Sequence, residues 1–412
     1  MEFIADFHIH SKYSRATSRD MNVKNLAYWA KLKGITLMGT GDFTHHLWLE
    51  ELKHSLDDCA NGLYQYNGVY FILTAEVSSI YSKRGKTYRI HNIIFSPSFK
   101  TVDKINEKLS RIGNLASDGR PILGLDAAEL ARIVFDIDEN CMIVPGHIWT
   151  PWFSLFGSMS GFDKIEDCFE EQTKNIFALE TGLSSDPRMN WRLSALDKFT
   201  LISNSDSHSP QKIGREANVF NCELDYQTIR DVLRTKDRSR FLYTVEFFPE
   251  EGKYHFDGHR MCGIRWSPKE TKDHNGRCPK CGRQVTVGVV NRVENLADRP
   301  QGFKPEGAIP FKRLIPLDEI IADTKGVAKT SISVAREYQA ALAKLGTEFD
   351  VLMRLKKDDL LKGLSPKAAE GVLRVREGKV DIKAGFDGEY GIISIFDANQ
   401  TPDKNEEQLK MF

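Results

Sequence analysis

Seven short apolar runs follow one another along the first half of the chain, and each stops at a histidine, an aspartate or a glutamate. The first covers residues 2–7 and is followed by His8 and His10. Segments with the spacing of amphipathic helices lie between the runs. Strand, ligand and helix in repeated order predict a βα barrel whose ligands gather at the carboxyl ends of the strands. The other runs are 34–41, 69–75, 87–90, 141–146, 176–179 and 200–205, and they end at Asp42, Glu76, His91, His147, Glu180 and Asp206.

The composition indicates a protein with more than one domain and no membrane segment. The chain has 412 residues, of which 41% are hydrophobic, enough for a large core and a smaller second one. No apolar run approaches the roughly 18 residues of a membrane span. The first candidate ligand, His8, stands too early to leave room for a signal peptide. Seven cysteines in a chain of this length do not suggest a disulfide scaffold, so we expect a cytoplasmic, nucleoid-associated protein.

The charge balance limits how nucleic acid could be bound. Lysine and arginine number 57 and aspartate and glutamate also 57, so the formal net charge is zero. The chain as a whole does not attract a polyanion, and any contact with nucleic acid must come from local patches.

The candidate ligands suit a centre with several metal ions. Alternate residues of a strand point the same way, so His8 and His10 can hold one ion. Asp206 and His208 repeat this spacing, and the Glu76 carboxylate could bridge two ions. A structural role is the alternative for single members, as a helix cap for Asp206 or a hydrogen-bonded core histidine for His91. The full candidate set is His8, His10, Asp42, His45, Glu76, His91, His147, Asp206 and His208.

Mixed imidazole and carboxylate ligands suit zinc, manganese or iron better than magnesium alone. Two or three ions that share carboxylates are the usual device for hydrolysis of phosphate esters, because they activate water and offset the charge of the phosphate. We therefore expect two or three divalent ions (Zn, Mn or Mg), with Glu76, Asp206 and His208 taking part in catalysis.

These motifs resemble the PHP (polymerase and histidinol phosphatase) superfamily of phosphoesterases. The resemblance implies a distorted seven-stranded βα barrel over residues 1–245. It assigns His8, His10, Glu76 and Asp206 to one ion, Glu76, His91 and His147 to the next, and His208 with Asp42 or His45 to a third. The chain has Ala16 and Phe43 where many members have histidines, so the third ion stays open, with His45 as a substitute ligand. Glu180 is either a ligand or a support for one.

A second metal motif follows the barrel. His259, Cys262, Cys278 and Cys281 have the spacing of a zinc ribbon, in which four ligands hold a structural zinc ion. His274 is an alternative fourth ligand. We place this ribbon domain at residues 246–298.

Residues 299–398 carry helical patterns in two units, each a helix, a glycine turn and a second helix. The arrangement resembles a tandem helix-hairpin-helix, in which backbone amides at a helix start meet a nucleic-acid phosphate. Lys325, Lys329 and Lys367 could contact the strand. An ordinary small helical domain is the alternative.

The last segment, 399–412, reads as a flexible polar tail. It ends in Gln408, Leu409, Lys410, Met411 and Phe412, which resemble the peptide motif that binds the bacterial sliding clamp. We expect Gln408, Leu409, Met411 and Phe412 to make that contact.

The order of barrel, ribbon, helical region and tail is similar to the endonuclease Q family. The resemblance implies a DNA repair enzyme that nicks on the 5′ side of uracil, hypoxanthine, xanthine or an abasic site, leaving 3′-hydroxyl and 5′-phosphate ends. An altered base is examined outside the stack. Trp149, Trp152 and Phe153, beside His147, could stack on it, or could form a core over the barrel mouth. Arg84 and Lys86 could hold the strand.

Three other interpretations stay open. A PHP-type exonuclease would degrade ends without a lesion. A small-molecule phosphatase of the histidinol-phosphatase type would need only the barrel. A clamp-tethered DNA-binding scaffold with an inactive metal site would bind DNA without cleaving it.

Overall fold

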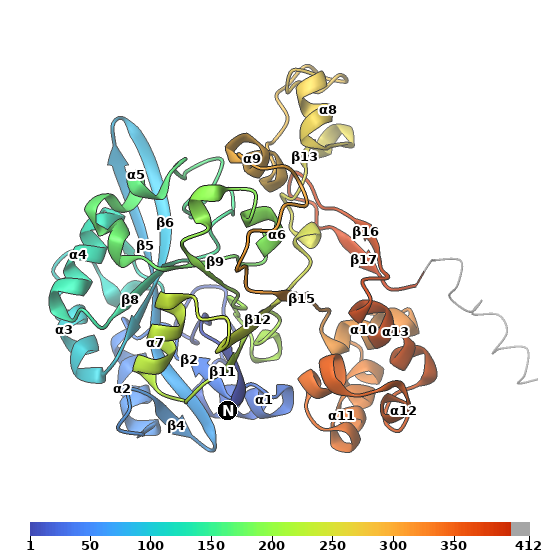
Figure 1. The fold of residues 1–412 in the computed structure, drawn as a ribbon, viewed down its shortest axis with the longest axis horizontal. Coiled ribbons are helices and arrows are strands. Elements are labelled where there is room, and N and C mark those ends of the chain that lie inside the picture. The colour runs from blue at the N-terminus through green and yellow to red at the C-terminus, as the bar shows by residue number, and fades with distance from the viewer. Residues whose placement is uncertain (397–412) are drawn as a thin grey trace, which may run out of the picture.

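A central sheet carries the first part of the chain. The structure is a computed structural model that describes residues 1–396. Strands β1 (Glu2–Asp6), β2 (Leu37–Gly39) and β5 (Val69–Lys83) are parallel neighbours. β6 (Lys86–Ser96) pairs antiparallel with β5, and β8 (Met142–Pro145) pairs antiparallel with β6 (Figure 1). A parallel pair, β9 (Ala178–Glu180) and β10 (Thr200–Ile202), follows, and a bridge between Ile9 and Ser207 joins its end to the chain after β1.

The sheet extends on the other side of β1. β11 (Ala217–Asn221) and β12 (Phe241–Glu246) are antiparallel, and β15 (Phe311–Arg313) adds a parallel edge strand to β12. The short strands β4 (Tyr64–Tyr66) and β7 (Ile122–Leu123) pair with β5, and β3 (Asp57–Asp58) pairs with β4.

Helices pack around this sheet through one apolar face each. In α7 (Tyr226–Thr235) the buried side chains are Tyr226, Ile229, Val232 and Leu233, the spacing of a single helical stripe. Its N-cap is Asp225, whose carboxylate accepts the Thr228 N–H. The other helices are α1 (Val23–Lys33), α2 (His46–Ser55), α3 (Phe99–Leu109), α4 (Ala127–Ile137), α5 (Ile165–Phe169) and α6 (Pro187–Asn190).

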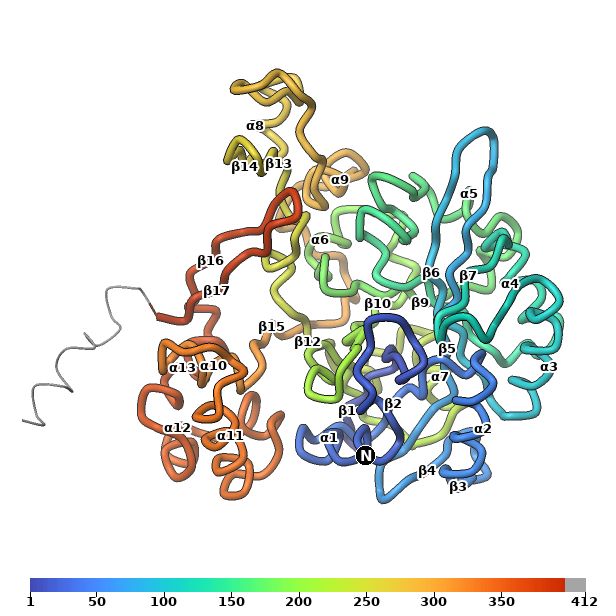
Figure 2. Tube along the Cα trace, turned by 180° about the vertical axis from the view of Figure 1, so that it is seen from behind, coloured from blue at the N-terminus to red at the C-terminus, as the bar shows by residue number. Residues whose placement is uncertain are grey.

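The expected mixed α/β fold around a central sheet is confirmed, but the strict repeat of strand, ligand and helix is wrong. No helix separates β5 from β6. The two strands form one long hairpin around Arg84 and Gly85, which have φ of 51° and 77° and make a tight two-residue turn. Glu76 and His91 therefore lie inside strands and not at their ends, because the pairing ladder continues past them to the turn. The hairpin projects beyond the rest of the sheet (Figure 2).

A small module follows the part that carries the central sheet and stands apart from that sheet in Figure 1. It contains the hairpin of β13 (Asp257–His259) and β14 (Ile264–Trp266), with α8 (Pro268–Asp273) and α9 (Val289–Leu296). The buried Asp257 carboxylate ties these pieces together, since it accepts from Thr271 of α8, from Asn291 of α9 and from the Gly288 N–H.

Four helices form the last compact part: α10 (Leu317–Lys325), α11 (Ile332–Leu345), α12 (Lys357–Leu360) and α13 (Pro366–Arg376). Ser365 caps α13 and Pro366 occupies its first turn, as expected from the sequence. The helical region expected over 299–398 also contains strands near both ends. β15 belongs to the central sheet, and β16 (Asp381–Lys383) and β17 (Ile392–Ser394) form a hairpin. This hairpin runs back toward β13 (Figure 2), where Gly385 and Gly391 donate to carbonyls of residues 250 and 251.

The helical part is joined to the part that carries the central sheet through a buried ion pair. Lys33 of α1 lies 2.7 Å from the Glu348 carboxylate, which also accepts from Tyr338 and from the Leu317 N–H. Lys33 and Glu348 are 4% and 3% exposed, so the contact is closed to solvent.

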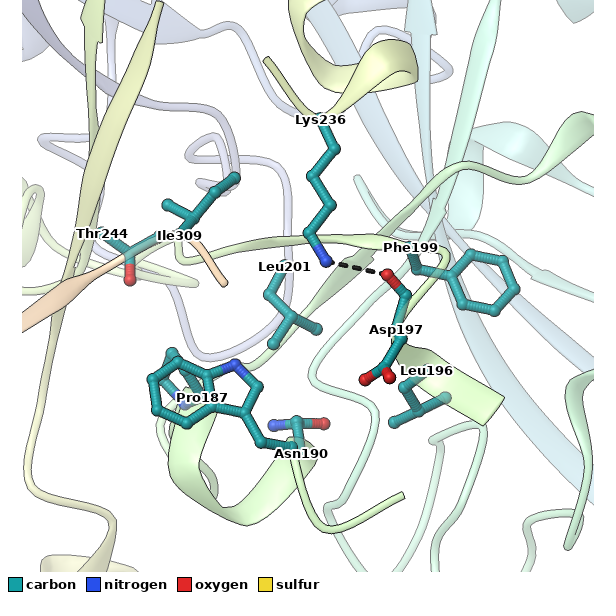
Figure 3. A pocket seen from close by; sticks show the side chains of 10 residues that line it. Pro187, Asn190, Leu196, Asp197, Phe199, Leu201, Lys236, Thr244 and Ile309 are labelled. Carbon is teal, nitrogen blue, oxygen red and sulfur yellow. Dashed lines mark hydrogen bonds between the residues drawn. The ribbon is translucent and has the colours of Figure 1, made fainter. Parts of the chain in front are cut away.

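A small cavity lies between α6 and the end of α7. Its lining includes Leu201, Phe199 and Ile309, and Lys236 donates to the backbone carbonyl of Asp197 across it (Figure 3). It contains none of the residues expected to hold metal. Among residues 1–396, no helix has both the length and the apolar character to cross a membrane.

Candidate metal centre

The first ligand group joins the end of β1, the middle of β5 and the loop after β10. His8, His10, Glu76 and Asp206 offer ligand atoms that all lie within 4.8 Å of one another. Nε2 of His10 is 3.1 Å from Oδ1 of Asp206 and 3.3 Å from Oε2 of Glu76, and Nε2 of His8 is 3.6 Å from that same Glu76 oxygen. Four side chains from three segments distant in sequence therefore face one point.

The second group shares Glu76 with the first. Oε1 of Glu76 lies 2.7 Å from Nδ1 of His91 and 3.1 Å from Nε2 of His147. The two imidazole nitrogens are 3.1 Å apart. Since Oε2 faces the first group and Oε1 the second, Glu76 is the residue that the two groups share, and its bridging of two ions stays a prediction.

The residues present fit divalent ions. Nε2 of His8 is buried and has no hydrogen-bond partner among the described residues, although it points at Glu76 and Asp206. A buried nitrogen without a partner is costly unless something binds its lone pair. Imidazoles and carboxylates converging on two points are the donor set that zinc, manganese or iron prefers.

Neighbouring side chains orient the ligands. The Glu180 carboxylate lies 3.0 Å from Nδ1 of His8 and accepts the backbone N–H of His147 at 2.7 Å. Nδ1 of His147 lies 3.1 Å from Oγ1 of Thr150. With Nδ1 engaged in this way, Nε2 of each imidazole is left for a metal ion. Glu180, left open between two roles, lies outside both ligand groups and contacts one member of each.

Three residues at or beside the ligand groups have strained backbone conformations. His147 and Asp206 have φ of 31° and 47°, and Asp42 has φ of 50°, all in the left-handed region that non-glycine residues rarely occupy. Such conformations persist where the surroundings fix them, and they cluster at functional sites.

Charge and burial set the protonation of the ligands. Burial lowers the pKa of His91 to about 4 despite the nearby Glu76, so the neutral imidazole that can bind metal prevails at neutral pH. Burial alone would raise the pKa of Asp206, but the facing His8 and His10 hold it well below its usual range.

Asp42 and His45 do not join either group. The Asp42 carboxylate lies 3.0 Å from Nδ1 of His10 and accepts from the Ser11 N–H and from the hydroxyls of Ser11 and Ser14. It orients His10 and has little capacity left for an ion. His45 stacks on Tyr13 at the start of α2, with ring centroids 4.5 Å apart.

His208 lies at the exposed edge of the first group. Its ring centroid is 4.5 Å from that of His10, and its Nδ1 is 3.0 Å from the Asp206 carbonyl oxygen. A third ion stays a prediction.

The ribbon residues also converge. His259, Cys262, Cys278 and Cys281 offer ligand atoms within 4.8 Å of one another, with Cys281 Sγ 3.8 Å from His259 Nδ1. His274, the alternative ligand, lies outside this group, stacked on Trp266 with ring centroids 4.4 Å apart.

Comparison with solved structures decides the family. The lesion-specific endonuclease PfuEndoQ from Pyrococcus furiosus matches with a TM-score of 0.87 and 32% sequence identity, over 100% of both chains. An endonuclease Q in complex with a 27-mer duplex substrate that has an abasic lesion at the active site matches with a TM-score of 0.86 and 32% identity, over 99% of this chain and 100% of that one. The chain belongs to the endonuclease Q family. The expectation of a metal-dependent phosphodiesterase is thereby confirmed.

Relatives from other organisms match over different lengths. Residues 316–379 match the family model described as MJ0043 C-terminal domain. Protein MJ0043 of Methanocaldococcus jannaschii is 35% identical over 271 residues, which are 62% of this chain and 33% of MJ0043, so the match spans about a third of that protein. Protein YqxK of Bacillus subtilis is 28% identical over 371 residues, 88% of this chain and 89% of YqxK.

In this endonuclease Q family member the three aromatic residues after His147 lie in different places. The expectation that Trp149 contacts a base is wrong, because its side chain is fully buried and its Nε1 donates to Asn190. It forms the loop core that was the alternative. Trp152 and Phe153 are half-buried, and the Phe153 ring centroid lies 4.9 Å from that of His91.

The basic candidates also differ from one another. Arg84 is exposed at the turn of the β5–β6 hairpin, and Lys86 donates to the Gly161 carbonyl. In the helical part, Lys325 and Lys329 are engaged in ion pairs with Glu337 and Glu319. Lys367 lies over the ring of Phe396, its Nζ 5.0 Å from the centroid.

The structure adds a residue that the sequence patterns did not point to. Nη1 of Arg120 lies 3.1 Å from Oε2 of Glu76, at the oxygen that the first ligand group shares. Arg120 is in a loop without strand or helix periodicity, so no pattern marked it. Its guanidinium is the positive charge closest to the ligands in the described ion pairs.

Proposed function

We propose that the protein is a DNA repair endonuclease that hydrolyses the phosphodiester on the 5′ side of a damaged nucleotide. The substrates would be duplexes with uracil, hypoxanthine, xanthine or an abasic site, and the products would have 3′-hydroxyl and 5′-phosphate ends. The observation that carries the proposal is the pair of ligand groups joined by Glu76, in a chain alike over its full length to an endonuclease Q bound to abasic DNA.

One ion would be held by His8, His10, Glu76 and Asp206 and a second by Glu76, His91 and His147. Zinc, manganese or magnesium bound there would activate a water molecule and offset the charge of the phosphate. Glu76 would keep the two ions at a fixed separation. A third ion beside His208 would need a further ligand, because the Asp42 carboxylate is taken by His10, Ser11 and Ser14 and His45 lies outside both ligand groups.

His208 is placed to act on the substrate side of the centre. Its Nδ1–H can donate to the Asp206 carbonyl, which leaves Nε2 free to exchange a proton or to meet the phosphate. Its side chain is 32% exposed, more than the other ligands of its group.

The surroundings of the centre suit an unstacked nucleotide. Phe153 lies beside His91, with the Arg89 guanidinium 5.5 Å from its ring centroid, and Trp152 lies against Tyr254. Aromatic faces next to a metal centre can support a base outside the helix. Arg84 and Lys86, on the projecting hairpin, would contact the backbone of the same strand.

The zinc-ribbon residues would stabilise the fold, and the helical part would bind DNA. His259, Cys262, Cys278 and Cys281 would bind a structural zinc ion, since all four positions of a tetrahedral site are filled by side chains. The helical part would act as a helix-hairpin-helix unit through the starts of α11 and α13. Lys325 and Lys329 pair with glutamates and Nζ of Lys367 is buried over the Phe396 ring, so each side chain would have to turn outward to meet a phosphate.

We also propose that residues 408–412 bind the bacterial sliding clamp. Gln408, Leu409, Met411 and Phe412 lie outside the described residues, so the proposal rests on the sequence motif. A labelled peptide of residues 403–412 should bind purified clamp in a fluorescence anisotropy titration. A peptide with Leu409 and Phe412 changed to alanine is the control, and equal binding by both would contradict the proposal.

The nuclease activity is tested with matched duplexes labelled at one 5′ end. They carry deoxyuridine, deoxyinosine, deoxyxanthosine, an abasic site or no lesion, and the products are sized on a sequencing gel. A single nick 5′ to each lesion is the expected result. Stepwise loss of nucleotides from an end would indicate the exonuclease, and hydrolysis of histidinol phosphate without cleavage of any duplex would indicate the phosphatase.

A further inference from the structure

The loop of residues 118–121 brings an arginine to the metal centre. Arg120 is placed with Nη1 3.1 Å from Oε2 of Glu76, and the Asp206 charge also acts on it. Its side chain is 27% exposed, whereas that of Glu76 is fully buried. The guanidinium therefore touches the ligands on one side and reaches solvent on the other.

Backbone contacts on both sides hold this loop in place. The Gly119 N–H donates to the Tyr13 carbonyl at 3.1 Å, and the Gly119 carbonyl accepts from the Thr44 hydroxyl at 3.2 Å. The Pro121 carbonyl accepts the Ser78 N–H at 3.0 Å, two residues beyond Glu76 on the same strand. The loop is thus tied to three segments that surround the centre.

Two further features fix the conformation of the loop that carries Arg120. The Asp118 carboxylate accepts the Arg120 N–H at 3.1 Å, which closes the turn before the arginine. A side chain at Gly119 would place its Cβ 2.3 Å from Oδ2 of Asp42 and 2.4 Å from Oγ of Ser14. Glycine is required there by this close approach, and the loop packs on the same Asp42 that orients His10.

The guanidinium has capacity beyond its contact with Glu76. It carries five N–H donors in a planar fork. Among the described residues Glu76 is the one carboxylate within ion-pair distance of Arg120, and no other acceptor takes a hydrogen bond from its side chain. If Arg120 only balanced the charge of Glu76, its loop would not need the backbone contacts that fix it, and its guanidinium would not need to reach solvent. The free N–H groups of the planar guanidinium have the geometry to donate hydrogen bonds to the oxygens of a phosphate.

We propose that Arg120 binds a non-bridging oxygen of the scissile phosphate and stabilises the charge that grows there in the transition state. This role rests on the proposed nuclease function and adds a catalytic residue to it. Asp118 and Gly119 act as positioning residues, because they reach the phosphate only through Arg120.

The first test measures single-turnover nicking of an abasic duplex by the metal-loaded full chain. Arg120→Ala should lower the rate by about 10²–10³-fold, the usual effect of removing one donor to a developing oxyanion. Arg120→Lys should recover part of the rate, and guanidinium ion added to Arg120→Ala should raise it. Arg111→Ala is the matched control and should keep the wild-type rate, because Arg111 is an exposed arginine just after α3 that pairs with Glu107.

A second test measures binding without turnover. The scissile phosphate is replaced by a neutral methylphosphonate, and affinity is measured by fluorescence anisotropy in a buffer in which the wild-type chain does not nick. Wild type should bind the phosphate duplex several-fold more tightly than the methylphosphonate duplex, and Arg120→Ala should bind both alike. Bound metal, measured by atomic emission, should be unchanged in Arg120→Ala.

The outcomes separate this inference from the proposed function. If the wild-type chain does not nick a lesion duplex at all, the proposed function fails. If the wild type nicks but Arg120→Ala nicks equally fast, or still prefers phosphate over methylphosphonate as the wild type does, the role of Arg120 is overturned. Loss of bound metal in Arg120→Ala would also overturn it, because the arginine would then serve the ligands.

Discussion

The carboxylate of Glu180 lies 3.0 Å from Nδ1 of His8, behind the metal centre. The same carboxylate accepts from the His147 N–H and from the Asn204 amide, so three donors meet its two oxygens. One buried side chain thereby fixes a ligand of each metal group. The two proposed ions depend on a common support as well as on a common ligand.

Changing Glu180 to glutamine tests this support. Glutamine replaces one of the two acceptor oxygens with a donor, so at least one of the three donors must lose its partner. We expect metal affinity to fall by about 10–100-fold, as is typical for groups that orient ligands. Isothermal titration with Mn²⁺ measures it, with the exposed Glu107→Gln as control. Unchanged affinity would show that Glu180 does not orient the ligands.

The ion pair of Lys33 and Glu348 should control how firmly the helical part is held. Lys33→Met leaves the Glu348 carboxylate buried without its partner, at an expected cost of about 3–5 kcal/mol. The double change Lys33→Met with Glu348→Gln should recover part of this loss, since no unpaired charge then remains. Thermal unfolding and limited proteolysis measure both. Exposed Lys31→Met is the control, and equal stability of Lys33→Met and that control would refute the prediction.

Buried Glu246 should make stability depend on pH. Burial, with the nearby Asp186, raises its pKa from 4.5 to about 8, although Thr244 and Thr181 donate to it. The folded state therefore keeps this proton between about pH 4.5 and 8, while the unfolded state loses it. Stability should fall as pH rises through this window, with the full cost present above pH 8.

The variant Glu246→Gln removes this ionisation, and it also removes a charge that raises the pKa of the buried neighbour Glu216. Its Tm should exceed that of the wild type at about pH 9 by roughly 5 °C or more, and the gap should shrink toward about pH 5. The exposed Glu223→Gln is the control and should follow the wild type. A gap that does not change with pH would mean that Glu246 is ionised in the folded state throughout.

The ribbon ligands should bind one zinc ion per chain. Cys278→Ser removes a thiolate from the group, and we expect zinc content to fall by one equivalent and residues 257–282 to become sensitive to protease. Cys59→Ser, which changes a free cysteine outside the group, should retain all its zinc. Equal zinc in both variants would exclude this site.

Strand geometry explains why six of the ligands could be predicted from the sequence. His8 and His10 are two residues apart at the end of a strand, and Glu76, His91, His147 and Asp206 each accompany an apolar run. The fold brings such positions together. The hairpin of β5 and β6 was also accessible, because Arg84 and Gly85 mark a two-residue turn between alternating strands. The hairpin was missed because a helix was expected after every strand.

Other features depend on contacts that no local pattern encodes. Asp42 turns toward His10 because hydroxyls of Ser11 and Ser14, from a different loop, meet its carboxylate. Trp149 is buried because Asn190 accepts from its indole, while Trp152, three residues on, stays half-buried. Arg120 reaches Glu76 from a loop that tertiary contacts alone hold in place.

The most direct test of the account compares the wild-type chain with Asp206→Asn on an abasic duplex and on an undamaged duplex of the same sequence. With Mn²⁺ present, the wild type should produce a single nick 5′ to the abasic site and leave the undamaged duplex intact. Asp206→Asn should fold normally, contain less metal and lose the nicking. A nick of the same position and rate from both proteins, or equal cutting of both duplexes, would contradict a lesion-directed metal centre built on these residues.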